Sequence, residues 1–455
     1  MSRRVAMIAG LIGLSFAVGL VTPSFAATIR VPANAPTIQI AIEKAQPLDT
    51  IVVDPGTYSE VINFGGKVIT VRSTNPSDPN VVAATVINAG GLGSVVTFTG
   101  GEDHNNSILD GFTITGGTIG IEGHSSRAII RHCVVRDNSN SGIYQADGLI
   151  EDCHILNNNY VGLNDCDGTI RRCIIDSNRG AGLSECDGTI IDSTVERSVG
   201  AGVSGGSIDI IRCTIASNQN GGTLYQTGDI EQSFIIGNNS YGVDGGGGLV
   251  RNSVVAGNRG SGIAAAKNVL NCTVASNGGY GFQGHTGTIR HCIIWDNQLG
   301  PIVSSTTPLF SGTANPYFFQ AGSWDELNRA WINYNYHLQP NSPYINAGDP
   351  NYPSDPNAVT QDIEGSPRVV GSRVDIGAYE FGGACEGSDF DGDETPDVCD
   401  PDIDNDGVPN FLDVCDYTPA GIAVDDTGRP LADANKDCIV DLRDFAILQN
   451  TMFGP

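Results

Sequence analysis

The sequence predicts an all-β fold in which the chain winds into a long coil, with about twenty residues in each turn. Three columns of residues support this prediction: a column of Cys or Ser, a column of Asn five residues further on, and a column of Gly four residues after the Asn. Each column recurs every nineteen or twenty residues in the region from Cys133 to Asn297. A period this short excludes repeats made of paired helices, which need about 33 residues or more.

The columns stay in register over consecutive units, and each has a physical reason. Apolar residues such as Ile170 and Ile175 can fill a narrow interior. Stacked Asn amides can bond to one another and to the backbone at a corner, and Gly provides the turn. The sequence therefore predicts a parallel β-helix in which each unit forms one coil. The columns are Cys133, Cys153, Cys173, Ser193, Cys213, Ser233, Ser253, Cys272 and Cys292; Asn138, Asn158, Asn178, Ser198, Asn218, Asn238, Asn258, Asn277 and Asn297; and Gly142, Gly162, Gly182, Gly202, Gly222, Gly242, Gly262 and Gly281.

The N-terminus predicts export. Arg3 and Arg4 precede an apolar run over residues 7–21, and residues 24–26 form a cleavage site, so residues 1–26 are expected to be a signal peptide. The mature protein is then secreted or held at the cell envelope or surface. No later stretch approaches the roughly 20 apolar residues of a membrane span. The net charge of −27 argues against nucleic acid as a partner, because phosphates would be repelled.

The β-helix is expected to cover residues 27–309 and to be capped at both ends. Residues 36–46 carry apolar residues at helical spacing, which predicts a short helix that plugs the open end of the coil. Residues 310–382 are expected to form a C-terminal cap. Their aromatic rings could stack on sugars, but burial of the last coil is the favoured interpretation. These rings belong to Tyr317, Phe318, Phe319, Trp324, Trp331, Tyr334, Tyr336 and Tyr344.

A group of acids recurs at one corner of the predicted coil. Asp147, Asp167 and Asp187 stack, and Asp165 and Glu185 lie beside them. Each stacked Asp precedes a Gly, so a turn is the structural interpretation. The functional interpretation is an acidic patch that binds calcium or sugar and forms the substrate-binding face.

Charged and Cys columns allow further alternatives. Arg131, Glu151, Arg171 stack, as do Asp152, Arg172, Asp192 and Arg212. Because charges of opposite sign lie on neighbouring coils, these residues are predicted to form ion pairs. The alternative is that Arg171 or Arg172 acts as a base that abstracts a proton.

The Cys column is interpreted as buried reduced thiols rather than a metal or redox site, because Ser replaces Cys at three positions. Cys166 and Cys186 form a second pair of the same kind. No catalytic motif is identified.

Residues 385–455 contain 18 Asp or Glu against three Lys or Arg, and the acids are spaced. In "DIDNDGVPNFLD", oxygen-bearing side chains at positions 1, 3, 5, 9 and 12 and Gly at position 6 have the spacing of a calcium loop. Because Ca²⁺ prefers oxygen ligands, calcium is the expected cofactor. The predicted ligands are Asp389, Asp391, Asp393, Asp397, Asp400, Asp402, Asp404, Asp406, Asn410, Asp413, Asp433, Asn435, Asp437, Asp441 and Asp444. Cys385, Cys399, Cys415 and Cys438 can form two disulfides in three connectivities.

These motifs resemble known families. The repeat over about residues 28–310 resembles right-handed parallel β-helix repeat proteins, the superfamily that contains pectate lyases, and "RVDIGAYEF" resembles the closing segment of exported bacterial β-helix proteins. Residues 383–432 resemble thrombospondin type 3 calcium repeats. Residues 433–455 resemble half of a dockerin or a single EF-hand, which implies a protein partner for the tail.

The sequence thus predicts an exported calcium-binding β-helix protein that acts as a polysaccharide-binding or cell-surface module. One alternative is a polysaccharide lyase or glycoside hydrolase that acts on an outer face of the β-helix; polysaccharide lyases of this fold can use a basic residue, and pectate lyases use calcium to neutralise uronate. A second alternative is a structural or adhesive surface protein.

Overall fold

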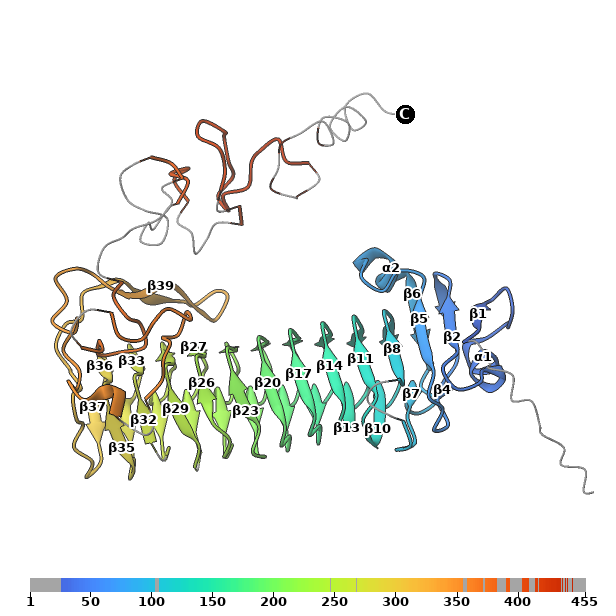
Figure 1. Cartoon of the computed structure of the whole chain (residues 1–455), viewed down its shortest axis with the longest axis horizontal. Coiled ribbons are helices and arrows are strands. Elements are labelled where there is room, and N and C mark those ends of the chain that lie inside the picture. Colours follow the sequence, from blue (N-terminus) through green and yellow to red (C-terminus); the bar gives the residue numbers. More distant parts are fainter. Residues whose placement is uncertain are drawn as a thin grey trace, which may run out of the picture.

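The computed structural model describes residues 26–102, 106–245, 247–266, 268–354, 358–370, 373–382, 390–392, 403–408, 414–415 and 417–434, together with residues 436, 438, 440 and 444. The predicted all-β fold is confirmed: the chain winds into a rod of stacked coils (Figure 1). The expected signal peptide lies almost wholly outside the described residues and stays a prediction. No described helix is both long and apolar enough to span a membrane.

The described coils form three parallel sheets that run along the rod. The first sheet contains β1 (Thr28–Val31), β2 (Thr50–Val53), β5 (Thr70–Ser73), β8 (Ile108–Asp110), β11 (Ile129–Arg131), β14 (Leu149–Glu151), β17 (Thr169–Arg171), β20 (Thr189–Ile191), β23 (Asp209–Ile211), β26 (Ile230–Glu231), β29 (Leu249–Arg251), β32 (Asn268–Leu270) and β35 (Thr288–Arg290). The second contains β3 (Gly56–Tyr58), β6 (Thr85–Asn88), β9 (Thr113–Thr115), β12 (Val134–Arg136), β15 (His154–Leu156), β18 (Ile174–Asp176), β21 (Thr194–Glu196), β24 (Thr214–Ala216), β27 (Phe234–Ile236), β30 (Val254–Ala256), β33 (Thr273–Ala275) and β36 (Ile293–Trp295). The third contains β4 (Ile62–Asn63), β7 (Val96–Thr97), β10 (Ile121–Ser126), β13 (Ile143–Ala146), β16 (Leu163–Asn164), β19 (Leu183–Ser184), β22 (Val203–Ser204), β25 (Thr223–Leu224), β28 (Val243–Asp244), β31 (Ile263–Ala264), β34 (Tyr280–Gln283) and β37 (Gly300–Val303).

The core is a continuous apolar interior that runs along the rod. In the second sheet, for example, Ile155 pairs with Ile175 on the next coil, and Ile175 with Val195. All three side chains are fully buried and belong to one hydrophobic cluster. Because each coil is short, its interior is filled almost entirely by one or two side chains per sheet, and their burial from water is the main force that holds the coils together.

The Asn column forms the predicted amide ladder. Asn158 Nδ2 donates a hydrogen bond to Asn178 Oδ1 at 3.1 Å, and the backbone N–H of Asn158 donates to the same oxygen at 3.0 Å. Asn158 Nδ2 also donates to the backbone carbonyl of Val135 at 3.1 Å. The ladder is interrupted at Ser198, whose buried hydroxyl has no hydrogen-bond partner. One side chain therefore satisfies several buried backbone groups at each corner, as buried polar groups require.

Two other columns show why small residues recur. A Cβ atom on Gly162 would lie 2.6 Å from the carbonyl oxygen of Gly182, so adjacent coils approach too closely for a side chain there. A second turn follows each strand of the second sheet from β12 to β36 and uses one residue with left-handed backbone angles. This position holds Asp137, Asn157, Ser177, Arg197, Ser217, Gly237, Gly257, Ser276 and Asp296.

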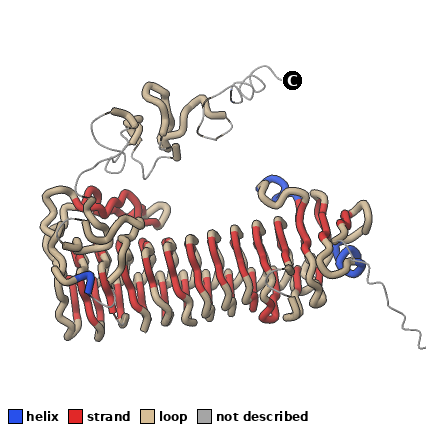
Figure 2. Tube along the Cα trace, viewed as in Figure 1, coloured by secondary structure: helices blue, strands red, loops and turns tan. Residues whose placement is uncertain are grey.

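Two α-helices lie near the N-terminal end of the rod (Figure 2). The predicted helix is confirmed as α1 (Ile38–Lys44), which packs against β1, β2 and β4 and adds three buried side chains, including Ile38, to the core. The Thr37 hydroxyl caps it by accepting a hydrogen bond from the N–H of Ile40 at 3.2 Å. That α1 protects the end of the rod stays a prediction. The other helix, α2 (Pro79–Ala84), packs on β6 and β9 and was not predicted.

Near the other end, the aromatic segment covers the side of the rod. The antiparallel hairpin of β38 (Phe318–Asp325) and β39 (Ala330–Leu338) lies along the coils that carry β27, β33 and β36 (Figure 1). A 3₁₀-helix, η1 (Tyr352–Ser354), follows. Ring-bearing residues such as Tyr336 share a buried cluster with outward-facing residues of the second sheet, including Val254. This lateral cover differs from the plug expected over the last coil; closure of the open end stays a prediction.

Candidate functional site

The predicted acidic patch occupies the corner between the third and first sheets. Asp147 Oδ1 accepts a hydrogen bond from the N–H of Asp167 at 3.3 Å, and Asp167 Oδ1 accepts one from the N–H of Asp187 at 3.1 Å. Asp187 Oδ1 in turn accepts a hydrogen bond from the N–H of Ser207 at 2.7 Å. The stacked carboxylates therefore have the structural role expected for Asp-Gly turns: each one caps the backbone of the next coil.

The two neighbouring acids complete a group of five carboxylates on three adjacent coils. Asp165 and Glu185 both have left-handed backbone angles, with φ of 54°. Asp165 Oδ2 accepts a hydrogen bond from Gln145 Nε2 at 2.8 Å, whereas the Glu185 side chain is exposed. Burial, together with repulsion from Asp147, Asp187 and Asp165, raises the pKa of Asp167. The corner thus holds an excess of negative charge that a cation would reduce.

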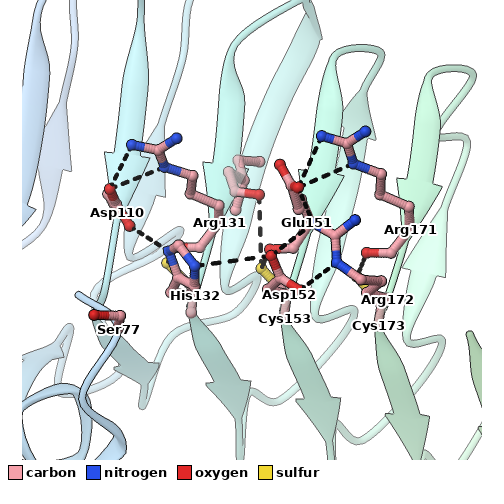
Figure 3. Close-up of polar contacts among 12 residues, drawn as sticks. Ser77, Asp110, Arg131, His132, Glu151, Asp152, Cys153, Arg171, Arg172 and Cys173 are labelled. Carbon is pink, nitrogen blue, oxygen red and sulfur yellow. Dashed lines mark hydrogen bonds and ion pairs between the residues drawn. The ribbon is translucent and has the colours of Figure 1, made fainter.

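The predicted charge pairing is visible on the first sheet and its turns (Figure 3). Arg171 Nε donates to Glu151 Oε1 at 3.0 Å. Arg172 forms two hydrogen bonds with Asp152, at 2.8 and 3.0 Å. These hydrogen bonds from Arg172 lower the pKa of Asp152 although partial burial opposes the shift. Arg172 also contacts Glu151. The pairing interpretation is therefore supported over a free Arg base at either position.

The pairing differs from expectation at one place in this ladder. Arg131 lies opposite Glu151 in register, but its guanidinium pairs with Asp110 on the preceding coil, at 2.9 Å. His132 Nδ1 also contacts Asp110, at 2.8 Å (Figure 3). Asp110 thus contacts both Arg131 and His132, whereas Glu151 already contacts Arg171 and Arg172 of the following coil. The sequence period does not determine whether an Arg pairs with an acid on the preceding coil or with one on the following coil.

The Cys columns consist of buried thiols. The eight described β-helix cysteines are unpaired and buried. Cys173 Sγ, for example, donates to the backbone carbonyl of Arg171 at 3.3 Å. Burial raises the pKa of Cys213 to about 12, so this thiol stays protonated at neutral pH. These observations agree with packing rather than redox or metal chemistry.

A polar cluster on the outer face of the second sheet was missed from the sequence. Asp176 and Glu196 stand opposite each other on β18 and β21. Arg197 bridges them: its Nε lies 2.9 Å from Asp176 Oδ1, and its Nη2 lies 2.5 Å from Glu196 Oε1. Ser177 Oγ donates to Asp176 at 2.7 Å. His154, on β15, interacts electrostatically with Asp176. The arrangement brings two carboxylates, a guanidinium and an imidazole together.

The environments of the two carboxylates push their pKa values apart. Burial opposes ionisation of Asp176, but hydrogen bonds from Arg197 and Ser177 outweigh burial and lower the pKa of Asp176. Burial raises the pKa of Glu196. Burial also lowers the pKa of His154, whose Nε2 is buried without a hydrogen-bond partner. The outward position three residues after each Cys or Ser of the column is charged only on certain coils, as at Asp176 and Glu196. This pattern is the signal in the sequence that could have revealed the cluster.

In the tail, acids from two predicted calcium loops line one cavity of about 340 Å³. They are Asp391 of the first loop and Asp404 and Asp406 of the second. Asp404 is buried, and its Oδ2 accepts a hydrogen bond from the N–H of Thr418 at 2.6 Å. Asp406 Oδ1 accepts one from the N–H of Val408 at 2.8 Å. Three carboxylates therefore line part of the cavity, and backbone N–H groups hold those of Asp404 and Asp406 in place.

This donor set fits calcium. Asp406 Oδ2 is buried without a hydrogen-bond partner, and burial together with repulsion from Asp404 raises the pKa of Asp406. A divalent cation bound by these oxygens would satisfy that atom and remove the repulsion. Hard carboxylate oxygens are the ligands that Ca²⁺ prefers. The other predicted ligands of the first two loops, Asp389, Asp393, Asp397, Asp400, Asp402, Asn410 and Asp413, lie outside the described residues.

The third loop is described only in part. Asp433 Oδ2 accepts hydrogen bonds from Arg429 Nη1 at 2.9 Å and from the N–H of Cys438 at 3.0 Å. Cys415 and Cys438 form a disulfide, which is part of one of the three predicted connectivities. Cys385 and Cys399 lie outside the described residues. Asp433 lies near both sulfurs, but sulfurs in a disulfide are not thiolates and would ligate a metal poorly. Asp444 is buried; Asn435, Asp437 and Asp441 lie outside the described residues.

Comparison with known families agrees with this geometry. Residues 70–207 match the family model described as a right handed beta helix region. The rod is a right-handed parallel β-helix. Residues 381–421 match the thrombospondin type 3 repeat, which is a calcium-binding type of repeat and spans the acids of the first two loops. No curated protein matches the sequence of this β-helix protein.

Solved structures with a similar fold include three enzymes. Pectate lyase Pel9A is 16% identical, with a TM-score of 0.41 and coverage of 78% of this chain and 97% of that chain. The catalytic domain of a GH87 alpha-1,3-glucanase in complex with nigerose is 12% identical, with a TM-score of 0.41 and coverage of 65% and 70%. An alginate lyase from Paenibacillus sp. is 18% identical, with a TM-score of 0.33 and coverage of 58% and 99%. At these values the likeness concerns the fold alone.

Proposed function

We propose that this chain is an exported calcium-binding β-helix protein that binds polysaccharide. The observation that carries the proposal is the group of carboxylates formed by Asp147, Asp165, Asp167, Glu185 and Asp187 on three adjacent coils. Neighbouring strands lie about 4.8 Å apart, so this corner presents acceptors at regular intervals along the rod. A polymer with repeated hydroxyl groups can bind along such a row, either directly or through bound calcium.

A polysaccharide array with the intact protein tests the proposal. In the presence of calcium, we expect retention of at least one polysaccharide and a loss of about tenfold in affinity on Asp187→Asn. Asp192→Asn is the matched control, because Asp192 is also exposed but pairs with Arg212 away from the corner. No retention of any polysaccharide would contradict the proposal. Equal weakening by both variants would show that only general charge matters.

The tail is proposed to bind calcium through Asp391, Asp404 and Asp406, and to serve as a spacer or as a docking element for a protein partner. Isothermal titration calorimetry with calcium should show fewer bound ions in Asp404→Ala than in the wild type. Asp426→Ala is the control, because this exposed acid belongs to the same tail but does not line the cavity. Absence of any heat change with the wild type would refute the assignment.

A second candidate function is cleavage of a polysaccharide on the outer face of the second sheet. It is favoured by Asp176 and Glu196, which stand side by side with pKa values shifted in opposite directions. Such a pair can divide the roles of base or nucleophile and general acid. Glycosidase carboxylates lie about 5 to 9.5 Å apart, and neighbouring strands allow the shorter distance.

Assays for new reducing ends and for the ultraviolet absorbance of unsaturated ends test this second candidate. Glu196→Gln should lower the rate by at least about a hundredfold if Glu196 is a general acid. Glu231→Gln is a control, because Glu231 is also a paired outward acid, on the first sheet. Activity that survives Glu196→Gln, or no activity on any polysaccharide, would remove this candidate.

A further inference from the structure

A cleft lies between the hairpin and the last coils of the rod, separate from the acidic corner. It encloses about 520 Å³. The coils contribute Arg259, Asp296 and Gln298 to its lining, and the hairpin contributes Trp324, Glu326 and Trp331. Aromatic side chains and a few polar groups converging on one concave surface are typical of small-ligand sites.

One wall of the cleft is held rigidly. The Trp331 side chain is buried, and its Nε1 donates a hydrogen bond to Tyr336 Oη at 2.9 Å. The indole lies directly over Gly257, where a Cβ atom would approach the ring to 2.1 Å. Its backbone lies over Gly237, one coil earlier, where a Cβ would come within 2.8 Å. After β12 to β24 the same turn position carries a side chain, whereas Gly237 and Gly257 leave room for Trp331.

The part of the lining next to Trp331 combines an aromatic ring with a guanidinium, since Trp324 pairs with Trp331 across the hairpin. The Arg259 guanidinium lies 4.6 Å from the centre of the Trp324 ring, and Arg259 Nη2 lies 2.5 Å from Glu326 Oε2. The Glu326 side chain is 74% exposed and that of Arg259 is 42% exposed. An ion pair this exposed contributes little to stability. Arg259 has five N–H donors, most of which can serve a ligand in the cleft.

We infer that this cleft binds a neutral pyranose unit of a polysaccharide, an inference that rests on the proposed function. The C–H face of a pyranose packs against the exposed part of an indole such as Trp324. Sugar hydroxyls both donate and accept, so they can donate to Asp296 and Glu326 and accept from Arg259 and Gln298. Among the described lining residues, two carboxylates stand against one guanidinium. The resulting negative charge disfavours a uronate and favours a neutral sugar.

The experiment is calorimetric titration of the intact protein with neutral gluco-oligosaccharides and, separately, with uronate oligosaccharides in the presence of calcium. We expect neutral oligosaccharides to bind and Trp324→Ala to weaken their binding at least about tenfold. Asp296→Ala should weaken it severalfold. Asp296 is exposed on a coil, so this second variant tests the cleft even if Trp324→Ala disturbs the hairpin. Asp192→Asn is the matched control and should leave this binding unchanged, because Asp192 is an exposed acid that pairs with Arg212 away from both the cleft and the acidic corner.

The outcomes separate the inference from the proposed function. If the wild type binds uronate oligosaccharides or other polysaccharides but no neutral oligosaccharide, the inference fails and the proposed function stands. If neutral oligosaccharides bind with equal affinity to the wild type, Trp324→Ala and Asp296→Ala, the cleft is not their site and the inference fails again. If no polysaccharide binds at all, both fail.

Discussion

The second sheet has two regions that share one backbone geometry but differ in their outer surface. On the middle coils the outward residues are polar or exposed: Ile174, for instance, is 45% exposed, and Asp176 and Glu196 follow in the next outward column. On the last coils most outward residues are apolar and pack against the aromatic segment, whereas Thr273 is polar. Val254, in the same column as Ile174, is fully buried beneath the aromatic segment.

This difference shows that the repeated residues determine the rod itself. Departures from the repeat mark the coils on which another segment of the chain packs. The inward column remains apolar from end to end. From Phe234 onward the outward column holds Phe234, Val254, Thr273 and Ile293, of which Thr273 alone is polar, and the left-handed turn position becomes Gly at residues 237 and 257. These changes coincide with the coils on which the aromatic segment packs.

The largest effect is expected for the residue that anchors the cover. Trp331→Ala should lower the free energy of unfolding of the covered coils by about 3–5 kcal/mol, because it empties a buried site. Leu327→Ala, at the 90% exposed tip of the same hairpin, should change it by less than about 0.5 kcal/mol. Urea unfolding followed by circular dichroism measures both. Equal effects would mean that the hairpin does not cover the rod.

The next largest effect on stability is expected at Gly257, one of the two glycines against which Trp331 packs. Gly257→Ser should cost about 2–3 kcal/mol, because its Cβ would collide with the Trp331 ring. A change to Gly at the same turn position on an uncovered coil, Asn157→Gly, should alter stability by less than about 1 kcal/mol, since that left-handed position suits Gly. Thermal unfolding of the two variants compares them. A tolerated Gly257→Ser would show that Trp331 is not fixed there.

The two regions should respond to pH with opposite signs. Burial, with repulsion from Asp375, raises the pKa of Glu380 in the C-terminal segment to about 7, from 4.5. Its stabilising contribution is present below pH 4.5 and is lost as pH rises towards 7, by about 2 kcal/mol. In the middle, the pKa of Asp152 is lowered, so its contribution is present above pH 3.8 and is lost at lower pH.

Tryptophan fluorescence can measure the first of these trends alone, because all three tryptophans, Trp295, Trp324 and Trp331, lie in the covered region. The urea midpoint from fluorescence should fall between pH 5 and 7.5 in the wild type and stay level in Glu380→Gln. A midpoint that rises over this range in the wild type would contradict the assigned shift.

The smallest effect compares one column directly. Val254→Thr should cost about 1–2 kcal/mol, because a hydroxyl is buried beneath the cover. Ile174→Thr, four coils earlier in the same column, should cost less than about 0.5 kcal/mol. Urea unfolding measures the midpoint of each variant, and the midpoint of Val254→Thr should be lower than that of Ile174→Thr. Equal costs would remove the distinction between covered and open coils.

Much of the rod could be predicted because, in a stack of coils, the spatial neighbour of a residue lies about twenty positions away in sequence. The Asn ladder, the buried thiols and the pairs of Arg171 with Glu151 and of Arg172 with Asp152 follow from that spacing. The bond from Arg131 back to Asp110 was not predicted, since both adjacent coils offer an acid.

Contacts between segments that do not share the period could not be predicted. Trp331 reaches Gly257 across an irregular stretch of chain, and Arg197 joins Asp176 and Glu196 from a turn rather than from a strand. In the tail, spacing predicted Asp391 and Asp404 as loop ligands, but it did not reveal that acids of two predicted loops line one cavity. Such contacts depend on how the chain folds back, which a local pattern does not specify.

The most direct test of the account is a titration of the intact protein with a neutral glucan, monitored by tryptophan fluorescence alongside calorimetry. Because the three tryptophans report only on the covered region, we predict that binding heat and a shift in tryptophan emission saturate at the same glucan concentration. Binding heat without any change in emission would place the glucan elsewhere and would contradict the account.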